Sequence, residues 1–286
     1  MPSVAVVTDS TAYLPEGLAD RYGICVVPLH VVLGGISGEE SVDIFPAEVA
    51  AALNERRVHV TTSRPTPGAF AEAYRSLGVR DVVSVHLSAL LSGTADSARL
   101  AAELVAAEGI QVRVVDSGSV AMGLGFPVIA AAEAAATGEG LDVVASAALS
   151  AAEATTTLLY VDTLEHLRRG GRVRAASALV GAALGVKPIL RVSHGEISLV
   201  EKVRTFSRAT ARLVELTVDA AGDGPVDVAV HHLAAPERAV RLAEKLRAAL
   251  PHAPSTGMSD VLISEVGAVV GAHVGPGCLG VVLWRR

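Results

Sequence analysis

Short apolar runs alternate with longer helical segments through the first half of the chain. The first run, Val4–Val7, is apolar at every position, which is typical of a strand buried on both faces of a sheet. Further strands are predicted at residues 25–33, 58–60, 82–86 and 111–115. Helices are predicted at residues 16–22, 46–55, 67–77, 92–108, 122–136 and 141–154, and a Gly/Ser/acid-rich loop at 34–43. This repeated order predicts a parallel sheet with helices on both faces.

The second half of the chain has a different pattern. Two β-prone runs at 187–192 and 196–202 flank Ser193-His194-Gly195, which predicts a hairpin. Other strands are predicted at 158–161 and 226–232, at 261–264 and at the end of the chain up to residue 283. Helices are predicted at 163–167, 175–184, 207–221 and 236–250. A hairpin together with strand–helix alternation predicts an α/β domain whose sheet is mixed or largely antiparallel.

Length and composition agree with two α/β domains. A chain of 286 residues is long for one core, and we expect domains at residues 1–157 and 158–286. The chain is 51% hydrophobic but only 3% aromatic, so its core should consist of many small contacts. The best candidate for a membrane span, residues 120–136, is interrupted by glycines, a proline and Glu133, so no span is expected. No signal peptide is expected, because the N-terminus leads directly into a strand.

Charge and cysteine usage narrow the function classes. The formal net charge is −6, whereas nucleic-acid-binding proteins usually carry an excess of basic residues. No nucleic-acid partner is therefore expected. Cys25 and Cys278 lie far apart and show no metal-ligand spacing, which is typical of a cytoplasmic protein with free thiols. We expect neither a metal nor a cofactor.

The sequence lacks the motifs of the common catalytic loops. It contains no Gly-Lys pair for a P-loop and no Gly-x-Ser-x-Gly elbow. Gly123-x-Gly125 lacks the third glycine of a dinucleotide-binding loop. The chain therefore lacks an obvious nucleotide site or hydrolase elbow of its own.

Clustered hydroxyl side chains follow four of the predicted strands. The clusters are Thr8/Ser10/Thr11, Thr61/Thr62/Ser63, Ser88/Ser92/Thr94 and Ser117/Ser119. The carboxyl ends of parallel strands share one edge of a sheet, where ligands bind, so the clusters predict a common polar site. Four independent helix caps would give the same pattern.

Four residues could contact an anion. Ser92 stands where a helix begins, so its hydroxyl and the free backbone N–H groups there either attract an anion or form an ordinary N-cap. His273 lies among glycines, where it either donates to a ligand or is satisfied by loop carbonyls. Arg172 follows two glycines and Arg204 ends a strand; each either meets an anion or is a solvated charge.

Together these motifs resemble the DegV family, whose characterised members are the FakB fatty-acid-binding proteins. The resemblance covers nearly the whole chain and depends on the order and spacing of its motifs. They are Thr8 to Ala12, Thr62-Ser63-Arg64-Pro65, Leu91 to Thr94, Asp116-Ser117, Leu164 to Arg172, Lys187 to Leu190, Lys202-x-Arg204 and Gly271 to Gly277.

The resemblance implies a two-domain α/β protein that holds a long-chain fatty acid between the domains and is a lipid carrier, not itself an enzyme. A separate ATP-dependent fatty acid kinase would phosphorylate the carboxylate, giving acyl-phosphate for phospholipid synthesis. Family positions that contact the carboxylate end correspond here to Thr62, Ser63, Ser92, Gly93 and His273. Arg172 and Arg204 correspond to positions linked to kinase docking or phosphate transfer.

The chain departs from the family pattern at two places. Arg64 stands where the family has glutamine, and it is expected to supply a charge. Ala272 and Val274 flank His273 where the family often has threonine, so fewer hydroxyl groups are expected around the head group of the ligand. Two alternatives stay open: a stand-alone small-molecule phosphotransferase or hydrolase that uses Ser92 with His273, and a regulatory sensor of a small ligand.

Overall fold

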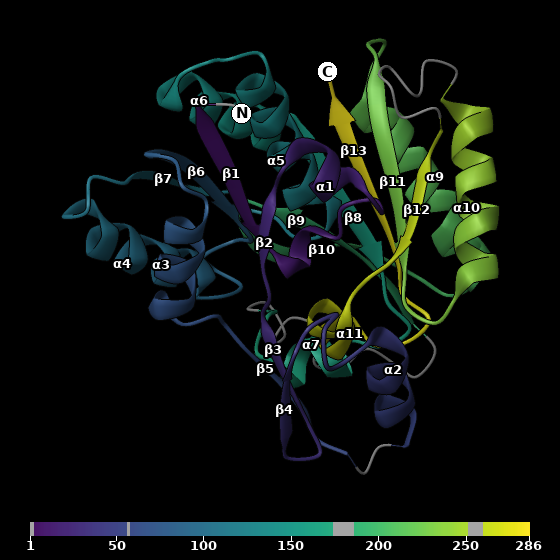
Figure 1. The fold of residues 1–286 in the computed structure, drawn as a ribbon. Helices are drawn as coiled ribbons and strands as arrows, with labels where there is room; N and C mark the ends of the chain where they lie inside the picture. The colour runs from purple at the N-terminus through teal and green to yellow at the C-terminus, as the bar shows by residue number, and fades with distance from the viewer. Residues whose placement is uncertain (1–2, 56–57, 174–185, 251–259) are drawn as a thin grey trace.

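The computed structural model describes residues 3–55, 58–173, 186–250 and 260–286. The chain forms two larger sheets, which stand side by side, and a small sheet below them (Figure 1). The predicted helix at 175–184 lies outside the described residues.

The first sheet has four strands, all parallel. In spatial order they are β2 (Cys25–Val27), β1 (Val4–Asp9), β6 (Asp81–His86) and β7 (Gln111–Asp116). Helices α5 (Met122–Ala136) and α6 (Leu141–Glu153) cover one face, and α3 (Pro67–Ser76) and α4 (Thr94–Ala106) cover the other. Strand side chains alternate between faces, so Val6 packs with α5 and Val7 packs with α3 and α4. The predicted parallel sheet with helices on both faces is confirmed.

The second sheet has six strands and is mixed. In spatial order they are β10 (Glu196–Val203), β9 (Lys187–Ser193), β8 (Thr155–Tyr160), β13 (Leu279–Arg285), β11 (Val226–His232) and β12 (Leu262–Glu265). Only β11 and β12 pair in parallel; every other neighbouring pair is antiparallel. Helices α9 (Phe206–Ala221) and α10 (Pro236–Ala249) cover one face of this sheet. The predicted mixed sheet and its hairpin are therefore confirmed.

A third, antiparallel sheet corrects two predictions. It consists of β4 (Ile36–Glu39), β3 (His30–Leu33) and β5 (Val60–Ser63). The expected loop at 34–43 contains β4, and the strand expected at 58–60 in the parallel sheet is the antiparallel β5. Short strands carry little information about their partners, because pairing depends on distant residues. Helices α2 (Pro46–Glu55), α7 (Glu165–Arg169) and α11 (Ala268–Val274) lie beside this sheet (Figure 1).

Two further expectations concern the connections between elements. The glycine-rich stretch expected to hold His273 in a loop instead forms helix α11. The expected domain boundary after residue 157 falls within β8, all of which pairs in the six-stranded sheet, and the boundary stays a prediction. After β1 the chain forms the short helices η1 (Ser10–Ala12) and α1 (Leu18–Tyr22).

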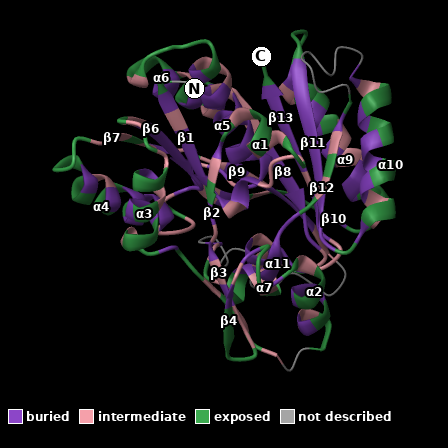
Figure 2. Ribbon diagram, in the orientation of Figure 1, coloured by how far each residue is buried: buried purple, intermediate pink, exposed green. Residues whose placement is uncertain are grey.

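The face of the six-stranded sheet opposite α9 and α10 is where the halves of the molecule meet. Leu159, Leu190 and Val192 of this face pack in one cluster with Val274 of α11 and Leu167 of α7. Buried positions concentrate in the strands and in the helices between the sheets, whereas the outer helix faces are exposed (Figure 2). The space between this face and α11 is the position of the candidate site.

A buried polar network fixes the ends of β1 and β6 next to that space. The Asp9 carboxylate accepts hydrogen bonds from the backbone N–H of Leu87 (3.0 Å) and Thr11 (3.1 Å) and from the Thr11 hydroxyl (2.5 Å). Its Oδ2 also lies 3.0 Å from Nδ1 of His86. Asp9 and His86 are fully buried, so these bonds hold the loop that follows β6 and leads to Ser92.

The Asp9 network makes a prediction for stability. Asp9→Ala should lower the free energy of unfolding by roughly 3 kcal/mol, because it leaves buried N–H groups without an acceptor. Chemical denaturation measures the change. Asp142→Ala, which removes an exposed carboxylate, should cost less than about 0.5 kcal/mol. A loss below about 1 kcal/mol for Asp9→Ala would contradict the role assigned to the network.

Candidate ligand-binding site

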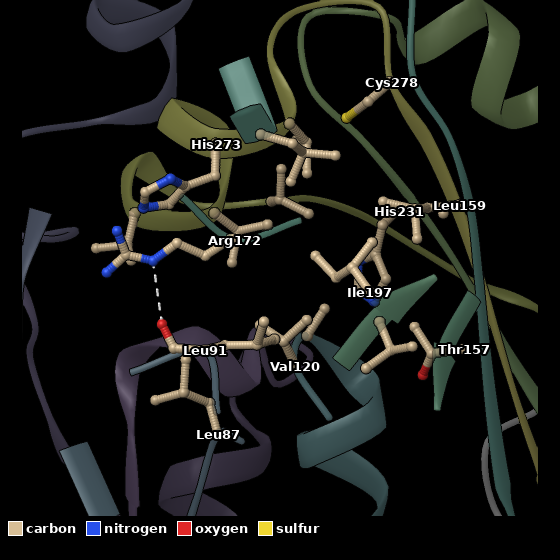
Figure 3. Close-up of a pocket in the computed structure, with 18 of the residues that line it drawn as sticks. Leu87, Leu91, Val120, Thr157, Leu159, Arg172, Ile197, His231, His273 and Cys278 are labelled. Atoms are coloured by element: carbon tan, nitrogen blue, oxygen red, sulfur yellow. Dashed lines mark hydrogen bonds between the residues drawn. The ribbon is translucent and has the colours of Figure 1, made fainter. Parts of the chain in front are cut away.

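An elongated, largely apolar cavity lies between the six-stranded sheet, helix α11 and the loops that follow β6 and β7 (Figure 3). Its volume is about 110 Å³, roughly ten times what one water molecule needs by the same measure. Apolar side chains make up most of the wall: Leu29, Leu87, Leu91, Val120, Ala121, Leu158, Leu159, Leu167, Val192, Ile197, Val266, Val269, Val270, Val274, Cys278, Leu279 and Val282. Such a cavity suits an extended apolar ligand.

The polar residues of the wall gather at its two ends. Figure 3 shows His273 and Arg172 together at one end and His231 and Thr157 at the other, with apolar side chains between them. Thr62, Ser63, Arg64 and Ser92 also line the cavity. Among the described residues that line it there is no aspartate or glutamate, so the wall carries only positive formal charge.

His273 is held by Thr62 and is neutral at pH 7. Its Nε2 lies 2.9 Å from the Thr62 hydroxyl oxygen, while its buried Nδ1 has no hydrogen-bond partner among the described residues. Burial, and secondly the charge of Arg172, lower the pKa of His273 to about 4. The ring packs against Gly170, where a Cβ would collide with Nδ1. An N–H is costlier to leave unpaired than a lone pair, so we assign the proton to Nε2, which donates to Thr62.

Arg172 reaches the cavity through the turn that ends α7. Gly171 adopts φ +70, a left-handed conformation that favours glycine, and the Arg172 backbone N–H then donates back to Leu167. The guanidinium donates from Nε to the Leu91 carbonyl (3.1 Å) and from Nη1 to the Gly170 carbonyl. Neither acceptor is a charged group, and three of the five N–H donors of the guanidinium have no partner among the described residues.

Ser92 is not the N-cap of α4. The cap is Gly93, which gives no side-chain hydrogen bond to the first turn. The Ser92 hydroxyl instead lies 2.9 Å from that of Thr94. Ser92 lines the cavity beside a helix end whose N–H groups have no side-chain cap, an arrangement that favours an anion.

The expected contact of Gly93 with the carboxylate stays a prediction. Gly93 does not line the cavity, but the guanidinium of Arg64 packs on its Cα, where a Cβ would collide with that group. Arg64 is exposed, lines the cavity and makes no ion pair within the described ranges. The expected charge at Arg64 is therefore present at the same end as Thr62 and Ser92.

Other predicted site residues lie elsewhere. Arg204 follows β10, is exposed and does not line the cavity. Only two of the four hydroxyl clusters supply lining residues, through Thr62, Ser63 and Ser92. Hydroxyls of the other clusters bond within the protein: Ser10 donates to Glu40, Thr11 to Asp9, and Ser119 bonds Thr157 (3.0 Å).

His231 closes the opposite end and was not expected there. Its Nε2 accepts from the Met122 backbone N–H (3.1 Å), and its Nδ1 lies 2.9 Å from the Ser264 hydroxyl. Burial lowers the pKa of His231 to about 4. Both ring nitrogens of His231 are thus hydrogen-bonded within the protein. This end of the cavity therefore presents to a ligand an uncharged side chain whose hydrogen bonds are already made. A histidine in a buried strand gives no sequence signal of this position.

A second unexpected feature orients α11. The buried Glu40 carboxylate accepts from the Val269 backbone N–H (2.7 Å), from the Tyr13 hydroxyl (3.0 Å) and from the Ser10 hydroxyl. The Tyr13 oxygen accepts from the Val270 N–H (3.2 Å). Burial raises the pKa of Glu40, against the opposing effect of these hydrogen bonds. A carboxylate at a helix start is favourable, so Glu40 fixes the helix that carries His273.

The geometry can be compared with the alternative of a stand-alone enzyme that uses Ser92 with His273. His273 bonds Thr62 and Ser92 bonds Thr94, so the serine and histidine of the alternative enzyme are not hydrogen-bonded to each other.

Within the described part of the chain no group of three or more His, Cys, Asp or Glu residues is arranged to hold a metal ion. None of the described helices has the length and apolar character needed to cross a bilayer.

The two buried histidines predict how stability depends on pH. Their folded pKa values of about 4 lie below the ordinary 6.5, so the unfolded chain binds protons first as pH falls. Stability is therefore complete above about pH 6.5 and declines toward pH 4, by up to about 1.4 kcal/mol per pH unit for each histidine.

Denaturation between pH 7.5 and 4.5 measures this decline. His273→Gln should make the slope shallower by up to about 1.4 kcal/mol per pH unit. His59→Gln removes an exposed histidine and should leave the slope as it is. An unchanged slope in His273→Gln would show that His273 is not held neutral by the fold.

Comparison with known proteins places this chain among close relatives. A DegV domain-containing protein of Streptomyces coelicolor is 54% identical over 99% of both chains. The structure of a DegV family protein from Thermus thermophilus, described as fatty acid binding, matches with TM-score 0.90 and 30% identity over all of both chains. The structure of DegV of Bacillus subtilis, described as a fatty acid binding protein, matches with TM-score 0.88 and 32% identity over all of both chains. The model of the DegV family, described as uncharacterised protein, matches residues 3–286. The chain belongs to the DegV family.

Proposed function

We propose that this protein binds one long-chain fatty acid in the cavity, with the carboxylate at the Thr62/Ser92/Arg172 end. The observation that carries the proposal is the asymmetry of the wall: a long apolar surface with arginines at one end that form no ion pair within the described ranges. A fatty acid has the same asymmetry. The relatives from Thermus thermophilus and Bacillus subtilis, which are described as fatty acid binding, support the assignment.

The apolar wall should supply most of the affinity. A 16-carbon chain has about 14 methylenes, and burying them offers about 11 kcal/mol before the costs of ordering and association. Hydrogen bonds to the carboxylate add roughly 1.5–3 kcal/mol each, much of which offsets the loss of its hydration. The polar end should therefore determine orientation more than affinity.

The carboxylate end has suitable donors. When His273 Nε2–H donates to Thr62, the hydroxyl proton of Thr62 is free to donate to the ligand. Ser92 offers a second hydroxyl, and Arg172 offers the N–H groups that bond none of the described residues. A neutral His273 thus acts by orienting Thr62, while Arg172 supplies the charge.

The family resemblance supports a further step. A separate fatty acid kinase would transfer the γ-phosphoryl group of ATP to a carboxylate oxygen of the bound fatty acid. One P–O bond forms to that oxygen, the bond to ADP breaks, and ADP leaves with its electron pair. The resulting acyl-phosphate would serve phospholipid synthesis in the cytoplasm, where ATP is available. Arg204, exposed outside the cavity, is the candidate for docking the kinase.

Binding to the delipidated protein tests the proposed function. After lipid removal, native mass spectrometry and calorimetry with palmitate should show one fatty acid per chain. Leu159→Trp places a large side chain in the cavity wall and should weaken binding at least tenfold. The matched variant Leu149→Trp lies on an exposed helix face and should bind as wild type does. Wild type that neither carries nor takes up a fatty acid would refute the proposal.

The role of Ser92 predicts a separation between binding and phosphorylation. Ser92→Ala should weaken palmitate binding by less than about fivefold, because the apolar wall dominates affinity. It should slow acyl-phosphate formation by the kinase by about 100-fold, because the carboxylate loses its fixed orientation.

Ser198→Ala is the matched control, since Ser198 is exposed on β10 and outside the cavity. It should change neither quantity. Equal losses of binding and phosphorylation in Ser92→Ala would argue against an orienting role.

A further inference from the structure

Two arginines from distant parts of the chain hold the loop Leu91-Ser92-Gly93 between them. Arg172 donates to the Leu91 carbonyl (3.1 Å), and Arg64 packs on the Cα of Gly93. Successive Cα atoms are about 3.8 Å apart, so the two contacts are separated by no more than about 7.6 Å along the loop. Ser92 stands between these two contacts in the chain, so an anion at its hydroxyl has an arginine contact at each neighbouring residue.

Among the described residues, no acidic side chain pairs with either arginine. The hydrogen bonds of the Arg172 side chain go to backbone carbonyls, and Arg64 has no ion pair in the part of the chain that the structure describes. The described lining residues include no carboxylate. A fatty acid brings one negative charge, which leaves one guanidinium unmatched, whereas a phosphate head group carries close to two above pH 7.

Guanidinium groups also suit phosphate by shape. Their planar donors bind phosphate oxygens in pairs, and such charge-assisted bonds are stronger than neutral ones. Arg172 donates two hydrogen bonds to backbone carbonyls, and these bonds fix the position of its guanidinium. The Arg64 guanidinium donates no hydrogen bond to the described residues and packs on Gly93, so all of its N–H groups are available to bind the ligand.

We propose that Arg64 and Arg172 make this end of the cavity selective for a phosphate head group over a carboxylate, with Arg64 as the residue that sets the preference. The ligand class is a long-chain acyl or alkyl phosphate. The inference rests on the proposed function, because the same cavity must hold the chain. It means that the protein retains the phosphorylated product more tightly than the fatty acid from which the product is made.

Paired titrations with palmitate and hexadecyl phosphate, a stable single-chain phosphate, test the proposal at pH 8. Wild type should bind hexadecyl phosphate at least tenfold more tightly than palmitate. Arg64→Gln should weaken hexadecyl phosphate about tenfold and palmitate less than threefold. Gly93→Ala, which displaces the Arg64 guanidinium without removing its charge, should shift the ratio in the same direction.

Two controls separate charge from a general effect. Arg64→Lys keeps the charge and should retain part of the preference, while Arg80→Gln removes an exposed arginine outside the cavity and should leave the ratio unchanged. Raising the salt concentration from 0.05 to 0.5 M should reduce the preference of wild type more than that of Arg64→Gln, because Arg64 is exposed to screening.

The outcomes distinguish the two proposals. Wild type that binds neither ligand refutes the proposed function itself. Wild type that binds palmitate, with Arg64→Gln weakening both ligands equally or neither, leaves fatty acid binding intact and overturns the selectivity of Arg64.

Discussion

The candidate site depends on one buried interaction, the carboxylate of Glu40 at the start of helix α11. Glu40 directly follows β4, and its oxygens accept from the backbone of Val269 and from two hydroxyls near the end of β1. The helix that it holds supplies four lining residues: Val269, Val270, His273 and Val274. A seven-residue helix has little stability of its own, so its position must come from such external bonds. The small antiparallel sheet thus acts as a support for the cavity wall, and it also carries Thr62 on β5.

Burial then controls the electrostatics of the site. Desolvation lowers the pKa of both lining histidines, so they are neutral hydrogen-bonding groups at physiological pH. Arginine stays charged under the same conditions, because its ordinary pKa is far higher. Positive charge is therefore confined to Arg64 and Arg172 at one end, and the rest of the wall is uncharged. This confinement gives a long amphipathic ligand only one favourable direction of entry.

Sequence patterns predicted the elements well and their contacts poorly. The continuous apolar run of β1 and the long helices α2, α5 and α9 carry a strong local signal, and their observed bounds agree closely with the predicted ones. The strand β5 was assigned to the wrong sheet, because four residues do not specify a partner. The bond from Val269 to Glu40 joins residues 229 positions apart, and no spacing rule reaches that far. Glycines misled the prediction for α11: Gly271 lies inside the helix and packs against Leu233, so it serves close packing and not a loop.

The predicted site residues differ in the kind of signal that identified them. Thr62, Ser92, His273 and Arg172 belong to motifs of the DegV family, and the fold brings all four to one end of one cavity. Gly93 belongs to the same motifs, but its contribution is the space that it leaves for Arg64. The first half of the chain supplies Arg64 and the Ser92 loop, and the second half supplies Arg172, so the charged end exists only when both halves are folded together. Cavity and charge are therefore coupled: any shift of one half against the other would open the apolar wall and separate the two guanidinium groups at the same time.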